Sequence, residues 1–120
     1  MKFFKKVDSK EVVTEFEKAY DEKGEYVEVV ANSTDAAVEK HVPVVEVNGS
    51  VVKVVVSDVT HPMLDTHFIQ WILIETEKGH QKKDLAYTDE PVAEFTLGED
   101  DKVLRAYEYC NLHGLWVKEV

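Results

Sequence analysis

The chain has little cysteine, few basic residues and no long hydrophobic stretch. Its one cysteine, Cys110, cannot form a disulfide within the chain. There are 14 basic residues against 24 acidic ones, so the formal net charge is −10. Nucleic-acid binding depends on a basic surface, and so does binding to anionic membranes. The charge balance therefore predicts neither a nucleic-acid partner nor a membrane partner.

Targeting and phosphate-binding signals are also missing. Residues 1–13 begin like a secretory signal, but no apolar core follows and acidic residues come at once. No apolar run among the 120 residues is long enough to span a bilayer. The five glycines are dispersed and match no phosphate-binding loop. We therefore expect a cytoplasmic protein with one domain and room for a small appendage.

Two regions differ in composition. Residues 1–36 are rich in Lys and Glu and hold no His, Pro or Cys. Within them, residues 11–16 open a short helix or a strand, Gly24 marks a turn, and residues 26–30 form a strand. The polar segment 32–35 is turn-prone, so we place a linker there. The predicted domains are therefore 1–36, an appendage, and 37–120, the main domain.

From Val38 onward the pattern is all-β. Short segments rich in β-branched and aromatic residues alternate with turn signals, and Asn48-Gly49 is a strong hairpin signal. Seven short strands with this spacing predict a β-sandwich. The expected strands are 43–47, 51–56, 68–76, 81–87, 94–97, 103–109 and 115–118.

Four of the five histidines stand at expected strand ends or in loops. His41 precedes the first strand, His61 lies in a loop, and His67 stands at the start of a strand. His113 follows Cys110 by three residues. A rigid sandwich can bring such residues together. His80, in a Lys-rich turn, is interpreted as a solvated surface residue.

These residues leave several interpretations open. A lone buried cysteine is commonly an inert thiol, and a cysteine hydrolase lacks an oxyanion-hole signature here. Zinc is the usual metal for Cys and His, but a structural zinc site closes at four ligands, and five candidates are present. Imidazole suits Fe, Cu, Zn and Ni. Spacing alone thus indicates a transition-metal site of open identity.

The segments around these residues add a resemblance that covers about residues 35–120. As a set and in this order they closely resemble the superoxide reductases, the desulfoferrodoxin and neelaredoxin family. The matching segments are Glu39-Lys40-His41-Val42-Pro43-Val44, His61-Pro62-Met63, His67-Phe68-Ile69-Gln70-Trp71-Ile72 and Glu108-Tyr109-Cys110-Asn111-Leu112-His113-Gly114-Leu115-Trp116.

The resemblance implies an immunoglobulin-like β-sandwich that holds one mononuclear iron. It implies one-electron reduction of superoxide to hydrogen peroxide, with electrons from a rubredoxin-like donor. By resemblance, Glu39 binds the oxidised iron at the open sixth position and Lys40 attracts superoxide. The implied ligands are His41, His61, His67 and His113 in the equatorial plane and Cys110 on the axis.

The chain departs from many relatives at its N-terminus. Those relatives carry a desulforedoxin-like domain with four cysteines around a second iron, whereas residues 1–36 hold no cysteine. The segment is either a degenerate, metal-free version of that domain or an unrelated extension. We expect a homodimer, with a tetramer as the other assembly.

Two other classes of function remain. One is an iron-binding electron-transfer module that keeps the site without turnover. The other is an immunoglobulin-like adhesion domain, which would bind no metal.

Overall fold

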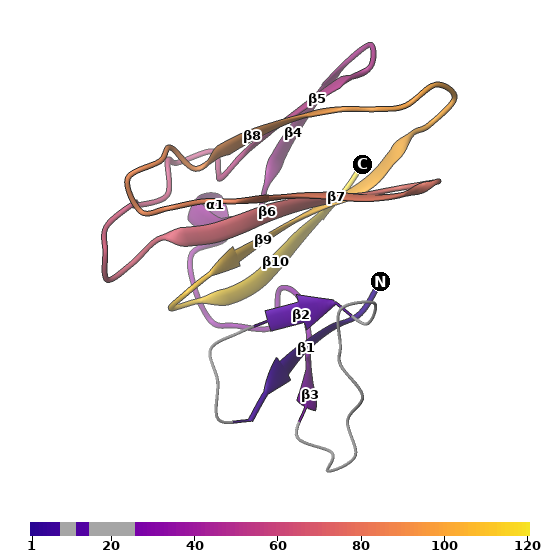
Figure 1. The fold of residues 1–120 in the computed structure, drawn as a ribbon. Helices are drawn as coiled ribbons and strands as arrows, with labels where there is room; N and C mark the ends of the chain where they lie inside the picture. The colour runs from indigo at the N-terminus through magenta and orange to yellow at the C-terminus, as the bar shows by residue number, and fades with distance from the viewer. Residues whose placement is uncertain (8–11, 15–25) are drawn as a thin grey trace.

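Two antiparallel sheets form a sandwich in the computed structural model, which describes residues 1–7, 12–14 and 26–120 (Figure 1). A four-stranded sheet in the order β10-β9-β6-β7 faces a three-stranded sheet in the order β4-β5-β8. These seven strands in residues 37–120 confirm the predicted immunoglobulin-like sandwich. Their bounds are β4 Val44–Asn48, β5 Val51–Val55, β6 Ile69–Thr76, β7 Gly79–Asp84, β8 Val92–Thr96, β9 Val103–Cys110 and β10 Gly114–Glu119.

The core between the two sheets is built from alternating side chains. On β5, Val52 and Val54 are fully buried while their neighbours on the strand are more exposed. From the facing sheet, β6 contributes Ile72 and Ile74, and β9 contributes Cys110 to the same cluster. The thiol is thus anchored in the packed core at the end of β9.

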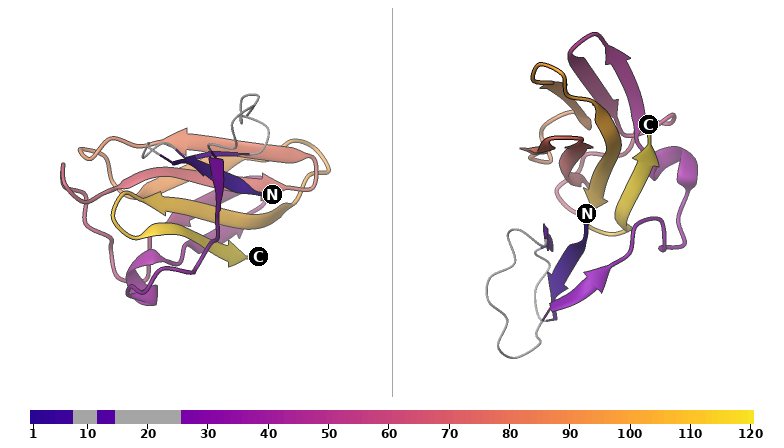
Figure 2. Two further views of the ribbon diagram at one scale, coloured as in Figure 1. Left: turned by 90° about the horizontal axis from the view of Figure 1, so that it is seen from below. Right: turned by 90° about the vertical axis from the view of Figure 1, so that its right-hand side faces the viewer.

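A third, small sheet covers the outer face of the four-stranded sheet (Figure 2). It consists of β1 (Phe3–Lys6), β2 (Val12–Thr14) and β3 (Tyr26–Val29) in the order β2-β1-β3. Its Phe3 ring lies 5.6 Å from that of Trp71 and 4.7 Å from that of Tyr107. We call this second cluster the outer cluster; it consists of Phe3, Val12, Trp71, Leu73, Tyr107, Tyr109 and Leu115.

The outer cluster explains the burial of the central strands. β6 and β9 are buried at almost every position because the sandwich core covers one face and the small sheet covers the other. The strand expected at 26–30 is present as β3, and the described part of 11–16 is β2. The turn predicted at Gly24 lies outside the described residues.

The segment between the small sheet and the sandwich is held against β10 by Asn32. Its backbone N–H donates to the Leu115 carbonyl over 2.9 Å. Its side-chain oxygen accepts the Val117 N–H at 2.9 Å, and its side-chain amide donates to the Val117 carbonyl at 3.3 Å. Asn32 has φ of 59°, a left-handed conformation that asparagine tolerates. The predicted linker therefore has a defined position along the edge of the sheet.

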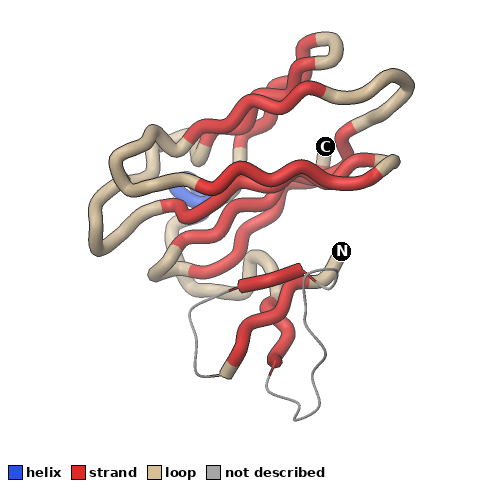
Figure 3. Tube along the Cα trace, in the orientation of Figure 1, coloured by secondary structure: helices blue, strands red, loops and turns tan. Residues whose placement is uncertain are grey.

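The expectation that everything after Val38 is β-structure is wrong at one point. Val38–His41 forms a single helical turn, α1, closed by the Val42 N–H donating to the Val38 carbonyl at 3.0 Å. Pro43 ends it, because the residue before a proline disfavours the helical conformation. One turn is too short to show helical periodicity in the sequence. Among the described residues α1 is the single helix (Figure 3). At this length it cannot span a bilayer.

Several strand ends also differ from the predictions by a few residues. β7 begins at Gly79 and ends at Asp84, whereas 81–87 was expected. β6 begins at Ile69, so His67 lies in the preceding loop, where it forms an isolated bridge with Leu64. At β7 the strand therefore begins within the segment that the sequence pattern had assigned to a turn.

Gly114 directly follows His113 and combines two constraints, of which Gly49 meets one and Gly98 meets neither. Its φ is +83°, and an added Cβ would lie 2.9 Å from Thr34 Oγ1. Gly49 has φ of +63° with open space, and Gly98 has open space without a positive φ.

In urea unfolding of the metal-free protein, we expect Gly98→Ala to change stability by less than about 0.5 kcal/mol. Gly49→Ala should cost about 1 kcal/mol, and Gly114→Ala about 2 kcal/mol or more.

The added loss in Gly114→Ala is assigned to the contact with Thr34. A second change, Thr34→Ala, should therefore recover part of it in the Gly114→Ala background. Equal losses in the Gly49 and Gly114 variants would show that the Thr34 contact contributes nothing.

Candidate metal centre

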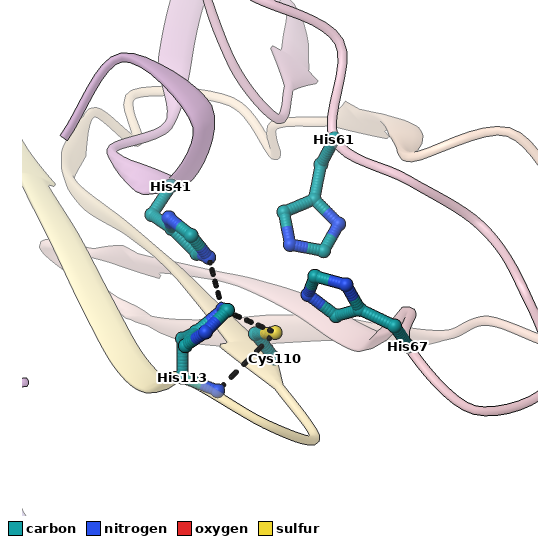
Figure 4. A group of neighbouring side chains, drawn as sticks. All are labelled: His41, His61, His67, Cys110 and His113. Atoms are coloured by element: carbon teal, nitrogen blue, oxygen red, sulfur yellow. Dashed lines mark hydrogen bonds between the residues drawn. The ribbon is translucent and has the colours of Figure 1, made fainter. Parts of the chain in front are cut away.

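Five potential ligands converge at one end of the sandwich (Figure 4). Each offers one donor atom, and the five atoms all lie within 4.8 Å of one another. They come from α1, from the loop between β5 and β6, and from the end of β9 and the turn that follows. We call this set the donor cluster; it consists of His41, His61, His67, Cys110 and His113.

The four imidazoles are arranged as a closed square. Neighbouring ring centroids in the order His41, His61, His67, His113 lie 4.7 to 5.0 Å apart, and the last ring lies 4.8 Å from the first. Each ring stands at 74° to 87° to the next. This arrangement presents the edges of four rings to a common centre.

Backbone carbonyls determine which nitrogen of two rings faces the centre. His41 Nδ1–H donates to the Ala37 carbonyl and His61 Nδ1–H donates to the Pro62 carbonyl, both over 2.7 Å. Each Nε2 therefore carries a lone pair. His41 Nε2 lies 3.1 Å from His113 Nδ1, the atom by which His113 faces the cluster.

Two of these nitrogens are buried and unpaired. His61 Nε2 and His67 Nε2 have no hydrogen-bond partner among the described residues. A buried polar atom without a partner costs about 1–3 kcal/mol. Lone pairs that face one another without a proton or a cation between them are unfavourable, so the cluster is arranged for a cation at its centre.

Cys110 closes the inner side of the donor cluster. Its side chain is fully buried, and its Sγ lies 3.9 Å from His113 Nδ1. The His113 backbone N–H donates to Sγ at 3.4 Å, which favours a thiolate. Burial nevertheless raises the pKa of the Cys110 thiol above its usual range. A bound cation is the partner that would keep this sulfur ionised.

Three of the four imidazoles, those of His41, His61 and His67, are neutral in the metal-free protein at pH 7. Burial lowers the pKa of His61 to about 4, and burial is also the main cause that lowers the pKa of His41 and of His67. The positive charge of Lys40 lowers the pKa of His41 and His67 further. Neutral imidazole is the form that binds metal, so the rings need no deprotonation.

The two residues before His41 lie outside the donor cluster. Both are exposed on α1. The positive charge of Lys40 acts on His41 and His67, since it lowers the pKa of both rings. Glu39 instead lines a surface hollow of about 540 Å³ together with Asp58 and Lys118, and its carbonyl accepts the Val59 N–H at 2.9 Å.

His80 lies away from the donor cluster, as expected. It is exposed on β7, where it pairs with Glu75 near the far end of the β6–β7 hairpin.

Asn111 supports the donor cluster through hydrogen bonds, although the sequence assigned it no role. Its side-chain oxygen accepts the Phe68 N–H at 2.9 Å, and its side-chain amide donates to the Thr66 carbonyl at 3.0 Å. Its backbone N–H donates to the Phe68 carbonyl at 3.2 Å. These bonds hold both neighbours of His67. An asparagine directly after a ligand, at the end of a strand, was the available signal.

Glu108 also escaped the sequence analysis. It lies two residues before Cys110 on the same face of β9, is fully buried, and has neither carboxyl oxygen paired among the described residues. Burial raises its pKa well above the usual range, so the carboxyl is neutral. In sequence it reads as an ordinary strand-end glutamate.

The part of the chain that matches a known protein family is the part that forms the sandwich. Residues 33–119 match the model of the desulfoferrodoxin family. This chain belongs to the desulfoferrodoxin family. The match begins in the linker and covers α1 and all seven sandwich strands.

Individual relatives agree with this membership. The chain is 48% identical over 84 residues to the desulfoferrodoxin homolog of Archaeoglobus fulgidus, an alignment of 70% of this chain and 66% of that relative. It is 44% identical over 97 residues to desulfoferrodoxin from Nitratidesulfovibrio vulgaris, covering 80% of this chain and 75% of that one. The crystal structure of the superoxide reductase from Treponema pallidum superposes with a TM-score of 0.78 and 42% identity, over 90% of this chain and 92% of that chain.

The family and the donor set together identify the cofactor as one mononuclear iron. Imidazole and thiolate suit a first-row transition metal, and the unpaired Nε2 atoms of His61 and His67 supply lone pairs for it. Five converging donors exceed the four ligands at which a structural zinc site closes.

We expect the metal-free protein to lose stability on acidification. The pKa of His61 is about 4 in the folded chain and about 6.5 when unfolded, so folding favours the neutral ring. That contribution is complete above pH 6.5 and is lost as the pH falls from about 6.5 towards 4. The loss from His61 should be about 2–3 kcal/mol by urea unfolding at stepped pH.

Two variants test the source of this loss. His61→Gln removes the titrating ring and should flatten the pH dependence, although His41 and His67 retain a part. His80→Gln, on the exposed hairpin, should leave it unchanged. If stability falls with pH equally in His61→Gln and in the unchanged chain, the loss does not come from His61.

Proposed function

We propose that the protein is a superoxide reductase in which His41, His61, His67, His113 and Cys110 would hold one iron. The square of four imidazoles over a buried thiol is the observation that carries the proposal. Desulfoferrodoxins and superoxide reductases among its relatives support the same activity.

The overall reaction takes one superoxide, one electron and two protons to one hydrogen peroxide. When bound, the iron supplies that electron by passing from the ferrous to the ferric state. The chain supplies the site: Cys110 is fully buried on the inner side, whereas His67 and His113 are partly exposed. A small anion therefore approaches from the side opposite the sulfur.

Lys40 is proposed to attract superoxide to this open side. The chain carries a net charge of −10, which repels an anion at long range. The Lys40 ammonium is exposed, and its charge acts on His41 and His67. It thus provides a local positive potential at the rim of the donor cluster, and it can hold water that donates a proton.

Glu39 is proposed to bind the oxidised iron at the sixth position. Its carboxyl belongs to an exposed residue of α1 and is not among the five converging donors. Residues two apart on a helix do not share a face, so Glu39 and His41 cannot both face the centre while α1 is wound. Binding would therefore accompany unwinding of this one turn.

The remaining proposals concern the electron donor, the assembly, the N-terminal segment and the cellular location. A rubredoxin-like protein is the proposed electron donor, and a homodimer is the proposed assembly, with a tetramer as the other possibility. We propose that residues 1–36 are a degenerate, metal-free desulforedoxin-like domain, and that the protein acts in the cytoplasm. The small β2-β1-β3 sheet in that segment supports the domain, and an unrelated extension is the alternative.

The purified ferrous protein should consume superoxide and yield hydrogen peroxide without releasing oxygen. A peroxide assay and an oxygen electrode, run on the same sample, measure both products. Stoichiometric oxygen release would identify a dismutase instead, and bound iron without superoxide turnover would identify an electron-transfer module.

The variant Cys110→Ser tests whether the Cys110 sulfur binds the iron. It removes the sulfur, so the visible thiolate-to-iron absorption of the oxidised protein should disappear while the four imidazoles remain. If that band persists in the variant, Cys110 is not the axial ligand.

Lys40→Ala should slow the reaction with superoxide by about three- to tenfold at low ionic strength, because one positive charge at the rim is lost. The dependence of the rate on salt should also weaken, as measured by pulse radiolysis over a salt series. Lys53→Ala is the control, since Lys53 is exposed on β5 and the change in net charge is the same. Equal slowing in both variants would remove Lys40 from the proposed mechanism.

A further inference from the structure

Trp116 contacts two members of the donor cluster from different parts of the chain. It lies on β10 and is 2% exposed. Its indole stacks on the His41 ring with centroids 5.0 Å apart and planes at 26°. Its Nε1–H donates to the backbone carbonyl of His113 at 3.0 Å. One side chain thus joins helix α1 to the turn between β9 and β10.

The stacked indole restrains the freedom that the His41 ring retains. The hydrogen bond from His41 Nδ1 to the Ala37 carbonyl fixes one point of the ring. Small changes in the two side-chain torsions can still tilt the ring while this hydrogen bond is kept. The indole face lies nearly parallel to the imidazole, so it restricts this tilting and keeps Nε2 directed at the centre.

The hydrogen bond to His113 acts on the other ligand. His113 follows Cys110 in a tight turn, and its N–H is already directed at the Cys110 sulfur. The indole N–H holds the carbonyl of the same residue. His41 Nε2 and His113 Nδ1 lie only 3.1 Å apart, so small rotations of either ring would change the angle between two donors.

We propose that Trp116 is a positioning residue of the metal centre, which sets the orientation of His41 relative to His113. This inference rests on the metal site of the proposed function. Trp116 does not bind the metal itself; it acts through two of the ligands. Residues that orient ligands typically change metal affinity by about 10–100-fold when they are lost.

The chain contains a matched control in its other tryptophan. Trp71 is 6% exposed on β6 and belongs to the outer cluster, on the opposite face of the same sheet. It stacks on Phe3 and on Tyr109, at 5.6 and 5.8 Å. Its aromatic contacts include no member of the donor cluster. Trp71→Phe therefore removes the same atoms from a comparably buried site away from the ligands.

The experiment compares the unchanged chain with Trp116→Phe, Trp116→Leu and Trp71→Phe. Fe²⁺ affinity is measured anaerobically by competition with a chelator, and the oxidised forms are compared by visible absorption and electron paramagnetic resonance. Trp116→Leu loses both contacts and should bind Fe²⁺ about 10–100-fold more weakly, with shifted spectra. Trp116→Phe keeps a ring over His41 and should show a smaller change in the same direction. Trp71→Phe should stay within about twofold, with unchanged spectra.

Urea unfolding of the metal-free variants separates positioning from stability. Trp71→Phe should lose stability comparable to Trp116→Phe without the spectral change. Unchanged affinity and spectra in both Trp116 variants, or an equal change in Trp71→Phe, would overturn the proposal. If Trp116→Leu does not fold, the two phenylalanine variants decide. An unchanged chain that binds no Fe²⁺ would overturn the proposed function itself, and with it the role of Trp116.

Discussion

Unprotonated imidazole nitrogens that face one another across a few ångströms are the constraint on which the rest of this structure depends. His61 Nε2 and His67 Nε2 are buried without a partner, and burial makes protonation of these rings unfavourable. The folded chain therefore holds its donors ready at a cost in free energy. That cost is tolerable because the core beneath Cys110 and the backbone bonds around the ligands keep the donors in place when no cation stabilises them.

The four-stranded sheet links the metal centre to the N-terminal segment. Its two central strands are covered on both faces, by the sandwich core and by the outer cluster. β9 carries Cys110 and Ala106 on one face and Tyr107 and Tyr109 on the other. A segment without cysteines thus still contributes apolar surface to the strand that ends in Cys110.

The sequence predicted the sandwich well, and the five residues that it named as candidate ligands lie together in the structure. Its errors have physical reasons. β-branched segments and the Asn48-Gly49 turn are local signals, so the seven strands could be read directly. The donor set depended on flanking residues, because spacing alone left the metal open. The helical turn at 38–41 is too short to show helical periodicity. The side-chain hydrogen bonds of Asn111 could not be read because their partners lie in a distant segment. Trp116 looked like one more apolar strand residue for the same reason.

The position of Asn32 along β10 has a consequence for how the family can vary. Asn32 is paired with Leu115 and Val117, and α1 begins six residues later. The intervening segment runs between two fixed points, and Thr34 lies against Gly114 within it. Insertions or deletions between residues 32 and 38 would thus change the geometry around the iron. Sequence upstream of Asn32 lies outside those two fixed points. It can therefore change in length without changing this connection, provided that the apolar contacts of the outer cluster with β9 are kept.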